Sequence, residues 1–506
     1  MERSIQHFLE EGTNRLQEIF NNGYKDPKNL ENVITSVFTE TDRLAKDILR
    51  DYFESIDQEI FESRVRKHYY KSEGFSSRTL VTSRGEVTFR MRWYTGKEDN
   101  KSIALLEREL GLMKDERVTE EAQAKVLKLC AGHSYRESGC LEEVDEEIIS
   151  RQTVKNIVHG LSFPEEKAPA VKKEVEYLYI DADEDHISRQ FNEEKGDLKV
   201  DSQGRKINTL IGKMVYVYEG IEREALRPKN KKGAQVRYRL KNPHYFCGLY
   251  EGSSENDRFW EEIYKFIDAH YDISKIRKIY LNADGGSWIS AGKWRFGKKL
   301  EEALDGFHLS KYLGKMTYHM LDSAEESRKQ LRCKIVDNDE AGFDELTRTL
   351  QEYCTDERQK ENIGKAADYI KNNWRAAMTR LHAKMLEDCR CAGSSTEAHV
   401  FHILSRRMST LPMAWSRHGA DMMCHLRAYY KNGGDMLELV RYSRSREMLK
   451  KAAGAEAESI PEKIVLKDVL RGSTATDPNR RYAELWQGSL SAGIKKKFWF
   501  SNQIWL

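Results

Sequence analysis

Acidic side chains gather at three places where the sequence predicts regular structure. Tyr177-Leu-Tyr-Ile-Asp-Ala-Asp-Glu-Asp-His-Ile187 predicts a buried strand that ends in carboxylates, and a second apolar stretch ends in Asp284 followed by two glycines. Far downstream stands Glu397, in the first turn of a helix that Ser394 or Ser395 could cap. Carboxylates at the ends of apolar strands are costly unless something neutralises them. A divalent cation does this readily, because Mg²⁺ prefers hard oxygen ligands.

The chemistry open to these acids is the cutting and joining of phosphodiester bonds. Two Mg²⁺ ions about 4 Å apart activate the attacking oxygen, stabilise the crowded phosphorus and neutralise the leaving oxygen. Such a site needs one acid that bridges the two ions and others that hold each ion singly. We therefore predict that acids of the first strand, together with Asp284 and Glu397, hold two Mg²⁺ (or Mn²⁺) ions that cut and rejoin DNA.

Each acid taken alone has a simpler explanation. Asp181, Asp183 and Asp185 could be a solvated strand end, and Asp284 with its glycine could be a turn. Glu397 could be a capping-box glutamate, which is the commoner role at that position of a helix. The order of the acids along the chain is more specific than any one of them, because a rigid core strand suits the bridging acid and a helix crossing that strand can supply the last one.

A sheet must position the first two acids. Period-two alternation places Val175, Tyr177, Tyr179, Asp181 and Asp183 on one side of the first strand, and Leu178 and Ile180 on the other. Apolar stretches at 206–211 and 213–218 are typical of an antiparallel meander in a mixed sheet. A strand acid, a second strand acid and a helix acid, in this order, are the RNase H-like layout, so we predict an α/β catalytic core with a mixed sheet.

Length and composition bound the class of protein. At 506 residues the chain suits about two to four domains. A hydrophobic content of 39% and a charged content of 33% suit a soluble protein, and a net charge of +2 does not by itself demand nucleic acid. The eight cysteines lack zinc spacing and indicate reduced thiols, and neither a signal peptide nor a run of ~18 apolar residues is visible. We expect a cytoplasmic protein without a membrane span.

A β-hairpin is predicted between Arg78 and Tyr94, with its turn at Arg84-Gly85. Its polar side carries four arginines beside aromatic residues: Arg78, Arg84, Arg90 and Arg92. Arginines interleaved with aromatics fit a ribbon that lies on a phosphate backbone. A solvated sheet face explains the same charges equally well.

Helical periodicity over 118–163 predicts a helix-turn-helix-like DNA-binding region. Its last helix begins at a Ser150 cap and presents side chains of the kinds that contact base edges in a major groove: Arg151, Gln152, Thr153, Lys155 and Asn156. An ordinary pair of packed helices is the alternative.

The remaining organisation follows from composition shifts. Phe163-Pro-Glu-Glu-Lys-Ala-Pro-Ala170 holds two of the eight prolines and predicts a linker. The predicted regions are a mainly helical N-terminal part at 1–70, the hairpin at 71–117, the helical DNA-binding region at 118–163, a first part of the core at 171–293, an all-α insertion at 294–388, a final core part at 389–440 and a basic tail at 441–506.

Five sequence blocks together resemble the bacterial insertion-sequence transposases of the ISLre type, relatives of the Mutator-like DDE transposases and formerly classed as an uncharacterised protein family. The blocks are Arg78-Thr-Leu-Val-Thr-Ser-Arg-Gly-Glu-Val-Thr-Phe89, Tyr179-Ile-Asp-Ala-Asp183, Asp284-Gly-Gly-Ser-Trp-Ile289, Asp305-Gly-Phe-His-Leu-Ser-Lys-Tyr-Leu313 and Gly393-Ser-Ser-Thr-Glu-Ala-His-Val400. The last block continues into Arg406-Arg-Met-Ser-Thr-Leu-Pro-Met-Ala-Trp-Ser416, and the resemblance covers nearly the whole chain.

The resemblance implies an RNase H-like core with a helical insertion and a catalytic triad of Asp183, Asp284 and Glu397. The second aspartate of the acid-Ala-Asp pattern matches the family's catalytic position, which favours Asp183 and leaves Asp181 as the reserve metal ligand. The tail block implies DNA contacts by Arg406 and Arg407. Two departures stand out: Glu184 replaces a common glycine, and Leu411 and Ala414 replace Arg and Gly.

The implied activity is metal-dependent DNA strand cleavage and strand transfer. The implied partners are double-stranded DNA, both the element's inverted repeats and target DNA, and further copies of the chain, at least a dimer on DNA in the nucleoid. A hydrolytic RNase H-like nuclease and a catalytically inactive DNA-binding regulator remain the alternatives.

Overall fold

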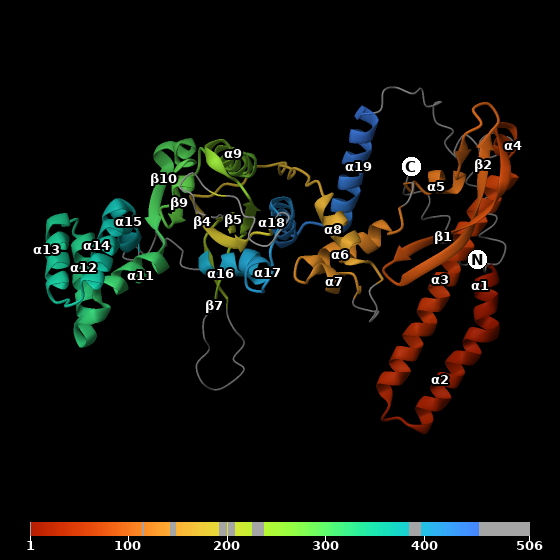
Figure 1. The fold of residues 1–506 in the computed structure, drawn as a ribbon, viewed down its shortest axis with the longest axis horizontal. Coiled ribbons are helices and arrows are strands. Elements are labelled where there is room, and N and C mark those ends of the chain that lie inside the picture. Colours follow the sequence, from red (N-terminus) through yellow and green to blue (C-terminus); the bar gives the residue numbers. More distant parts are fainter. Residues whose placement is uncertain are drawn as a thin grey trace. The chain divides into compact units, whose positions relative to one another are not determined.

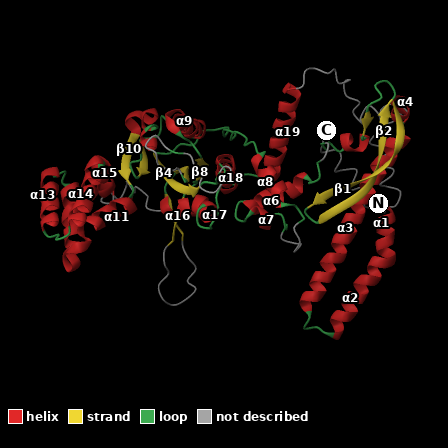
Figure 2. Ribbon diagram, in the orientation of Figure 1, coloured by secondary structure: helices red, strands yellow, loops and turns green. Residues whose placement is uncertain are grey.

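The computed structural model describes most of the chain and divides it into two compact units. The described residues are 2–113, 116–141, 148–191, 200, 208–224, 237–383 and 396–454. The first unit comprises Met1–Lys125, Cys140–Ile149 and Glu447–Leu506, and the second comprises Val126–Gly139 and Ser150–Arg446. Figures 1 and 2 show the elements of each unit. The region at 118–163, predicted to be helix-turn-helix-like, is divided between the two units: 118–125 and 140–149 belong to the first unit, and 126–139 and 150–163 to the second.

The first unit combines helices with a long hairpin. Its helical elements are α1 (Glu2–His7), η1 (Phe8–Gly12), α2 (Thr13–Lys25), α3 (Leu30–Glu62), α4 (Arg64–Tyr69) and α5 (Leu105–Glu109). The strands β1 (Tyr70–Thr82), β2 (Gly85–Gly96) and β3 (Ser102–Ile103) form one antiparallel sheet. Phe53, Ile56 and Ile60 of α3 pack with Phe89 and Met91 of β2, so the apolar stripe of the helix covers the apolar face of the hairpin.

The hairpin turns one residue earlier than the sequence predicts. Thr82 pairs with Gly85, which leaves Ser83 and Arg84 as the two turn residues instead of Arg84 and Gly85. Gly85 already belongs to β2 and has a φ of 106°, a value that favours glycine. The Thr82 hydroxyl donates to the Gly85 carbonyl at 2.8 Å and closes the turn.

A five-stranded mixed sheet forms the centre of the second unit. Its strands are β4 (Tyr177–Ser188), β5 (Thr209–Tyr218), β8 (His244–Gly248), β9 (Lys278–Ala283) and β10 (Leu300–Leu304), in the order β10-β9-β4-β5-β8. β4, β5 and β8 are antiparallel neighbours, whereas β9 lies parallel to β4 and β10 parallel to β9. β6 (Ile221–Glu224) and β7 (Arg237–Leu240) form a separate pair. The mixed α/β class is therefore as predicted, with the first acid strand in the middle of the sheet.

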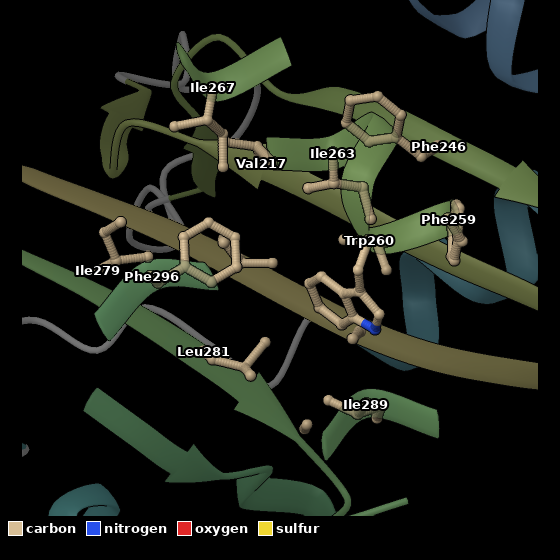
Figure 3. Close-up of a cluster of buried hydrophobic side chains, with 14 of the residues drawn as sticks. Val217, Phe246, Phe259, Trp260, Ile263, Ile267, Ile279, Leu281, Ile289 and Phe296 are labelled. Carbon is tan, nitrogen blue, oxygen red and sulfur yellow. The ribbon is translucent and has the colours of Figure 1, made fainter. Parts of the chain in front are cut away.

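One face of this sheet is covered by α9 (Gly252–His270). Leu178, Ile180 and Ala182 of β4 point to this face and leave the acids on the other, as the alternation predicts. The cluster in Figure 3 joins them to α9 and to the segment after β9, which contains α10 (Ser287–Ser290) and η2 (Lys293–Lys299). Its labelled members are Val217, Phe246, Phe259, Trp260, Ile263, Ile267, Ile279, Leu281, Ile289 and Phe296.

A helical insertion follows the last strand, on the side of β10 (Figure 1). Its elements are α11 (Gly306–Thr317), η3 (Tyr318–Ser323), α12 (Ala324–Val336), α13 (Glu340–Glu352), α14 (Glu357–Asn372) and α15 (Trp374–Ala383). They enclose a hydrophobic core of their own, with Leu313, Leu331, Phe343 and Ile370 at its centre. Within the predicted range 294–388, β10 occupies 300–304 and the described helices of the insertion span 306–383. The sequence Leu-Glu-Glu-Ala-Leu has no strand propensity of its own, and pairing with β9 overrides it.

Helices from the end of the described chain lie with the second unit. They are α16 (Thr396–Val400), η4 (Phe401–Ser405), α17 (Arg406–Met408), α18 (Arg417–Lys431) and α19 (Met436–Gly454), the last of which runs past the boundary of the unit at 446. The earlier helices α6 (Glu120–Cys130), α7 (Tyr135–Ser138) and α8 (Arg151–His159) span 120–159. Among the residues described, no helix is both long and apolar enough to cross a bilayer. The candidate cap residues Ser394 and Ser395 and the part of the predicted tail beyond 454 lie outside the described residues.

Candidate active site

The first two acids lie at the same edge of the sheet. β4 and β9 are parallel, and Asp181 pairs in register with Asn282. Asp183 and Asp284 each follow that pair by two residues, so they continue the same face beyond it. The carboxyl ends of neighbouring parallel strands form the crevice where α/β proteins commonly bind ligands. The pairing of β4 with β9 therefore supplies what the sequence alone could not, which is the proximity of the two aspartates.

The negative charges of both other predicted acids affect the pKa of Asp183. Its pKa is raised to about 7, first because it is largely buried and then because the charges of Asp284 and Glu397 disfavour a further negative charge. The backbone N–H of Glu184 donates to Asp183 Oδ1 at 2.8 Å and partly offsets this rise. Three carboxylates that are far apart along the chain thus lie within electrostatic reach of one another.

Asp284 is held by the turn that follows it and by the insertion. The N–H of Gly286 donates to Asp284 Oδ1 at 2.9 Å, which fixes the side chain against its own loop. Gly285 between them has a φ of 88° and faces Asn373, so a side chain there would be strained and crowded. The Tyr369 hydroxyl of α14 donates to the Asp284 carbonyl at 2.6 Å. The helical insertion therefore helps to place the second acid.

Glu397 stands exposed in the first turn of α16, and its neighbours anchor that helix to the sheet. Thr396 is buried, and its hydroxyl donates to Asp181 Oδ2 at 3.2 Å. On the other side of Glu397, the His399 ring lies 4.7 Å from the Tyr216 ring, and its Nδ1 lies 2.9 Å from the Tyr245 hydroxyl. The third acid thus projects from a short helix whose inner side contacts the sheet at several points.

Asp181, the reserve metal ligand, is placed differently from Asp183. It is 0% exposed, and burial raises its pKa to about 6 although its hydrogen bonds oppose that rise. The donors to its carboxylate are the hydroxyls of Tyr216, Tyr218 and Thr396 and the side-chain amide of Asn282. With these donors in place its oxygens face protein groups, so the arrangement favours Asp183 over Asp181 as the first metal ligand.

His308 is a residue that sequence reasoning did not assign to the site. It lies in the first turn of α11, with its Nδ1 3.3 Å from Oδ2 of Asp305, the residue that caps that helix. The pKa of His308 is raised, first by Asp305 and further by the charges of Asp183 and Asp284. The spacing Asp305-Gly-Phe-His308 directly after β10 was the signal in the sequence, since one turn of helix brings the two side chains together.

The donor chemistry of these acids fits a hard cation. Asp183, Asp284 and Glu397 offer only carboxylate oxygens, the ligands that Mg²⁺ and Mn²⁺ accept, and a bound cation would relieve the repulsion that raises the pKa of Asp183. Within the described part of the chain, however, no three His, Cys, Asp or Glu side chains are grouped closely enough to hold a metal ion as they stand. The charges of Asp284 and Glu397 therefore act on Asp183, but the described side chains are not close enough together to coordinate a metal ion without moving.

Two of the four hairpin arginines predicted to contact DNA have side chains that are largely covered by partners within the first unit. Arg78 lies 3.0 Å from Glu107 and donates to the Glu116 carbonyl at 2.7 Å. Arg92 donates to Asp57 of α3 at 2.6 Å, and the side chains of this pair are only 13% and 2% exposed. Both guanidinium groups are therefore committed to the packing of the first unit.

Arg84 and Arg90 remain at the surface. The Arg84 side chain is 53% exposed at the hairpin turn, 3.4 Å from Asp42. Arg90 is exposed and lies over the Phe75 ring at 4.7 Å. Acids of α3 lie along the same edge of β2, because Glu54 and Asp57 accept hydrogen bonds from the N–H groups of Arg90 and Arg92. Arg84 and Arg90 are therefore the two of these four arginines with the more exposed side chains.

The α8 helix has two distinct sides. Val154 and Val158 are buried, while the predicted DNA-reading residues Arg151, Gln152, Lys155 and Asn156 are exposed. Thr153 is half-buried, and its N–H donates to the Ser150 hydroxyl at 3.2 Å as part of the cap. Gln152 Nε2 donates to Asn156 Oδ1 at 2.9 Å, which orders two of the exposed amides. A polar face of this kind is accessible to a nucleic acid.

The tail-block arginines also differ from each other. Arg407 is 5% exposed; its Nε donates to the Cys130 carbonyl at 3.2 Å, and its guanidinium lies 4.9 Å from the Trp415 ring. It joins α17 to the end of α6, and its guanidinium is enclosed by other side chains of the second unit. Arg406 next to it is exposed.

The fold defines a mixed α/β protein in which two aspartates, Asp183 and Asp284, lie at the same edge of the central sheet. Residues 24–445 match a family described as an uncharacterised protein family, UPF0236. The chain belongs to that family.

Similar proteins are known from two bacteria. A UPF0236 protein of Caldanaerobacter subterraneus subsp. tengcongensis is 29% identical over 467 residues, which cover 92% of this chain and 90% of that protein. Another from the same strain is 30% identical over 474 residues, covering 92% and 85%. A UPF0236 protein in the vanSb 3′ region of Streptococcus gallolyticus is 25% identical over 420 residues, covering 81% and 84%.

Among solved structures, the Drosophila P element transposase strand transfer complex matches with a TM-score of 0.23 and 9% identity, over 65% of this chain and 82% of that one. A likeness of this size carries no argument about the fold or the activity.

Proposed function

We propose that this protein is a DDE transposase of a bacterial insertion sequence, with an RNase H-like core that cleaves DNA strands and transfers them with Mg²⁺ or Mn²⁺. The observation that carries the proposal is the electrostatic coupling of Asp183 to Asp284 and Glu397 at one edge of the sheet. The central strand, its parallel neighbour and a later helix each supply one acid, in the order of the RNase H-like layout.

The acids would divide the work of holding two cations. When bound, the ions would polarise the phosphate, activate the attacking oxygen and neutralise the leaving oxygen. Asp183, on the central strand between the other two elements, suits the bridging position, and Asp284 and Glu397 suit one ion each. The first cut would free a 3′-hydroxyl, which then attacks a second duplex.

The name of one relative favours a mobile element. The relative at 29% identity carries a name that joins many locus designations of a single strain. A protein encoded at many places in one genome is what an element that copies itself would produce. A regulator that has lost its chemistry gives no reason for such multiplication.

DNA would be contacted by the exposed polar residues. The face of α8 with Arg151, Gln152, Lys155 and Asn156 is the proposed base-reading element, and Arg84, Arg90 and Arg406 are proposed phosphate contacts. Two element ends must be brought together before transfer, so we propose at least a dimer on DNA, associated with the nucleoid.

A strand-transfer assay tests the proposal. Pre-cut duplexes that carry the inverted repeats flanking the gene are incubated with a circular target and Mg²⁺. The wild type should join the 3′-hydroxyl end to the target, whereas Asp183→Asn, Asp284→Asn and Glu397→Gln should each lower the rate by orders of magnitude. Glu176→Gln is the matched control, because Glu176 is an exposed acid just before β4, paired with Arg277.

The same assay separates the alternatives. A hydrolytic nuclease would cut the duplex in the presence of Mg²⁺ but would join no end to the target. An inactive regulator would bind the repeats without any metal dependence. Strand transfer that survives Asp284→Asn or Glu397→Gln would rule out the triad.

A further inference from the structure

The carboxylate of Asp181 is buried in the middle of the second unit and fully hydrogen-bonded. Its Oδ1 accepts from Asn282 Nδ2 at 2.6 Å and from the Tyr218 hydroxyl at 3.1 Å. Its Oδ2 accepts from the Tyr216 hydroxyl at 2.6 Å and from the Thr396 hydroxyl at 3.2 Å. An ionised carboxylate offers about four acceptor positions, so these donors fill them.

Two of these four donors come from the chain segments that carry the other proposed catalytic acids. Asn282 lies on β9, two residues before Asp284. Thr396 lies on α16, directly before Glu397. Asp181 itself lies on β4, two residues before Asp183. The buried carboxylate of Asp181 therefore joins β4 to β9 and to α16. Its bonds to Asn282 and Thr396 lie within two residues of Asp284 and Glu397.

Such a connection is needed because the acids repel one another. The charges of Asp284 and Glu397 raise the pKa of Asp183, so a negative charge on Asp183 is disfavoured by the other two acids. The two tyrosine hydroxyls come from β5 and fix the carboxylate from the remaining side. A buried carboxylate is tolerated only when its oxygens are hydrogen-bonded, so its bonds to β9 and α16 are costly to break.

We propose that Asp181 is a positioning residue that holds β9 and α16 to β4 and so sets the separation of the three metal-binding acids. The proposal rests on the proposed function, since it concerns the same site. Asp181 does not touch the ions in this account; it acts through Asn282 and Thr396. Residues that orient metal ligands in this way commonly change metal affinity by about 10–100-fold when altered.

Thr396 offers the cleanest test, because Thr396→Val removes one hydroxyl and keeps the volume of the side chain. Thr396→Ser should restore the bond, since it keeps the hydroxyl. Thr317→Val is the matched control: Thr317 is also fully buried, but its hydroxyl donates at 3.0 Å to Leu313 of its own helix in the insertion. All variants are purified as full chains and compared by thermal unfolding.

The first readout is binding of Mn²⁺ alone, measured by electron paramagnetic resonance, with Glu397→Gln marking the signal of the site. We expect Thr396→Val to weaken Mn²⁺ binding by about tenfold or more, while Thr396→Ser and Thr317→Val stay close to the wild type. Unchanged affinity in Thr396→Val, in a protein whose Glu397→Gln variant loses the ion, would overturn the positioning role.

The second readout is hydrogen exchange of the backbone amides at 400–405 in metal-free protein. Thr396→Val should speed exchange there and leave α9 unchanged, because only the α16 end loses a bond to the sheet. A wild type that binds no Mn²⁺ would refute the proposed metal site, and exchange alone would then decide the role of Asp181. Exchange at the wild-type rate in Thr396→Val would overturn the positioning role of Asp181.

Discussion

Asn282 and Asp181 stand side by side on parallel strands, with Asn282 Nδ2 donating to Asp181 Oδ1 at 2.6 Å across 101 residues of sequence. This bond joins the last pair of the β4–β9 ladder, at the point where both strands approach their acids. A slip by one residue would turn Asp183 or Asp284 to the opposite face of the sheet. The register that includes this buried pair is therefore the one that places Asp183 and Asp284 on the same face.

The insertion should influence the rate through Tyr369. Tyr369→Phe removes the hydroxyl that donates to the Asp284 carbonyl at 2.6 Å and keeps the ring stacked on Tyr312. We expect DNA cleavage to slow by about tenfold and to require more Mg²⁺, because the turn that carries Asp284 loses an anchor. Cleavage rates over a Mg²⁺ series measure this. Tyr353→Phe, at a tyrosine that is 69% exposed in the same insertion, should have no effect; equal rates for both variants would contradict the prediction.

Local patterns in the sequence predicted much of the core. Alternation predicted that Asp183 and Ile180 lie on opposite faces of one strand, and the apolar run before Asp284 predicted a second strand. Both predictions were possible because both signals depend on neighbouring residues. The approach of the first-strand acids to Asp284 was inferred from metal chemistry and from the order of the acids, and the choice of Asp183 from family resemblance, since strand pairing over this separation leaves no local pattern. β10 was missed for the same reason: two of its five residues are glutamates, and its strand form depends on β9.

Arginine roles were the least predictable part of the site. Arg92 and Arg407 occupy positions whose sequence suggests DNA contact, yet the partners that bury them come from distant segments. Asp57 precedes Arg92 by an entire strand, and Cys130 lies in another helix from Arg407. Sequence gives the charge of a side chain, whereas its availability is decided by tertiary contacts.

The hairpin arginines should separate into structural and DNA-contacting residues. Arg92→Ala leaves Asp57 buried without its ion-pair partner and should destabilise the protein by about 3–5 kcal/mol, as measured by urea denaturation. Arg84→Ala should change stability by less than about 0.5 kcal/mol, because its side chain is 53% exposed. In DNA-binding titrations Arg84→Ala should weaken affinity, and a loss of stability equal to that of Arg92→Ala would contradict the assignment.

The exposed face of α8 should contact both the phosphate backbone and the base edges of DNA. Lys155→Ala should weaken binding to all DNA sequences alike and lower the slope of log affinity against log salt by about one. Asn156→Ala should reduce the preference for the element's inverted repeats and leave that slope unchanged. Fluorescence anisotropy at several salt concentrations measures both. Lys265→Ala, at an exposed lysine of α9, is the control; the same salt slope in Lys155→Ala and wild type would exclude α8 from the interface.

The helix that carries Glu397 should make the protein sensitive to acid. Burial lowers the pKa of His399 to about 4, below its ordinary value near 6.5. Between these two values the unfolded chain binds a proton that folded His399 does not, so folding stability is complete above about pH 6.5 and is lost as the pH falls towards 4. His399→Phe keeps an aromatic ring beside Tyr216 but cannot titrate.

Urea denaturation at several pH values between about 4 and 7 measures this contribution. As the pH falls, the free energy of unfolding of His399→Phe should decrease less steeply than that of the wild type. The slope is the relevant quantity, because the variant also loses the contact with the Tyr245 hydroxyl and so starts from a lower stability at pH 7. His186→Gln, at a histidine whose side chain is 61% exposed, should keep the wild-type slope. Identical slopes for His399→Phe and wild type would show that protonation of His399 does not oppose folding, and the acid sensitivity would then have to arise elsewhere in the chain.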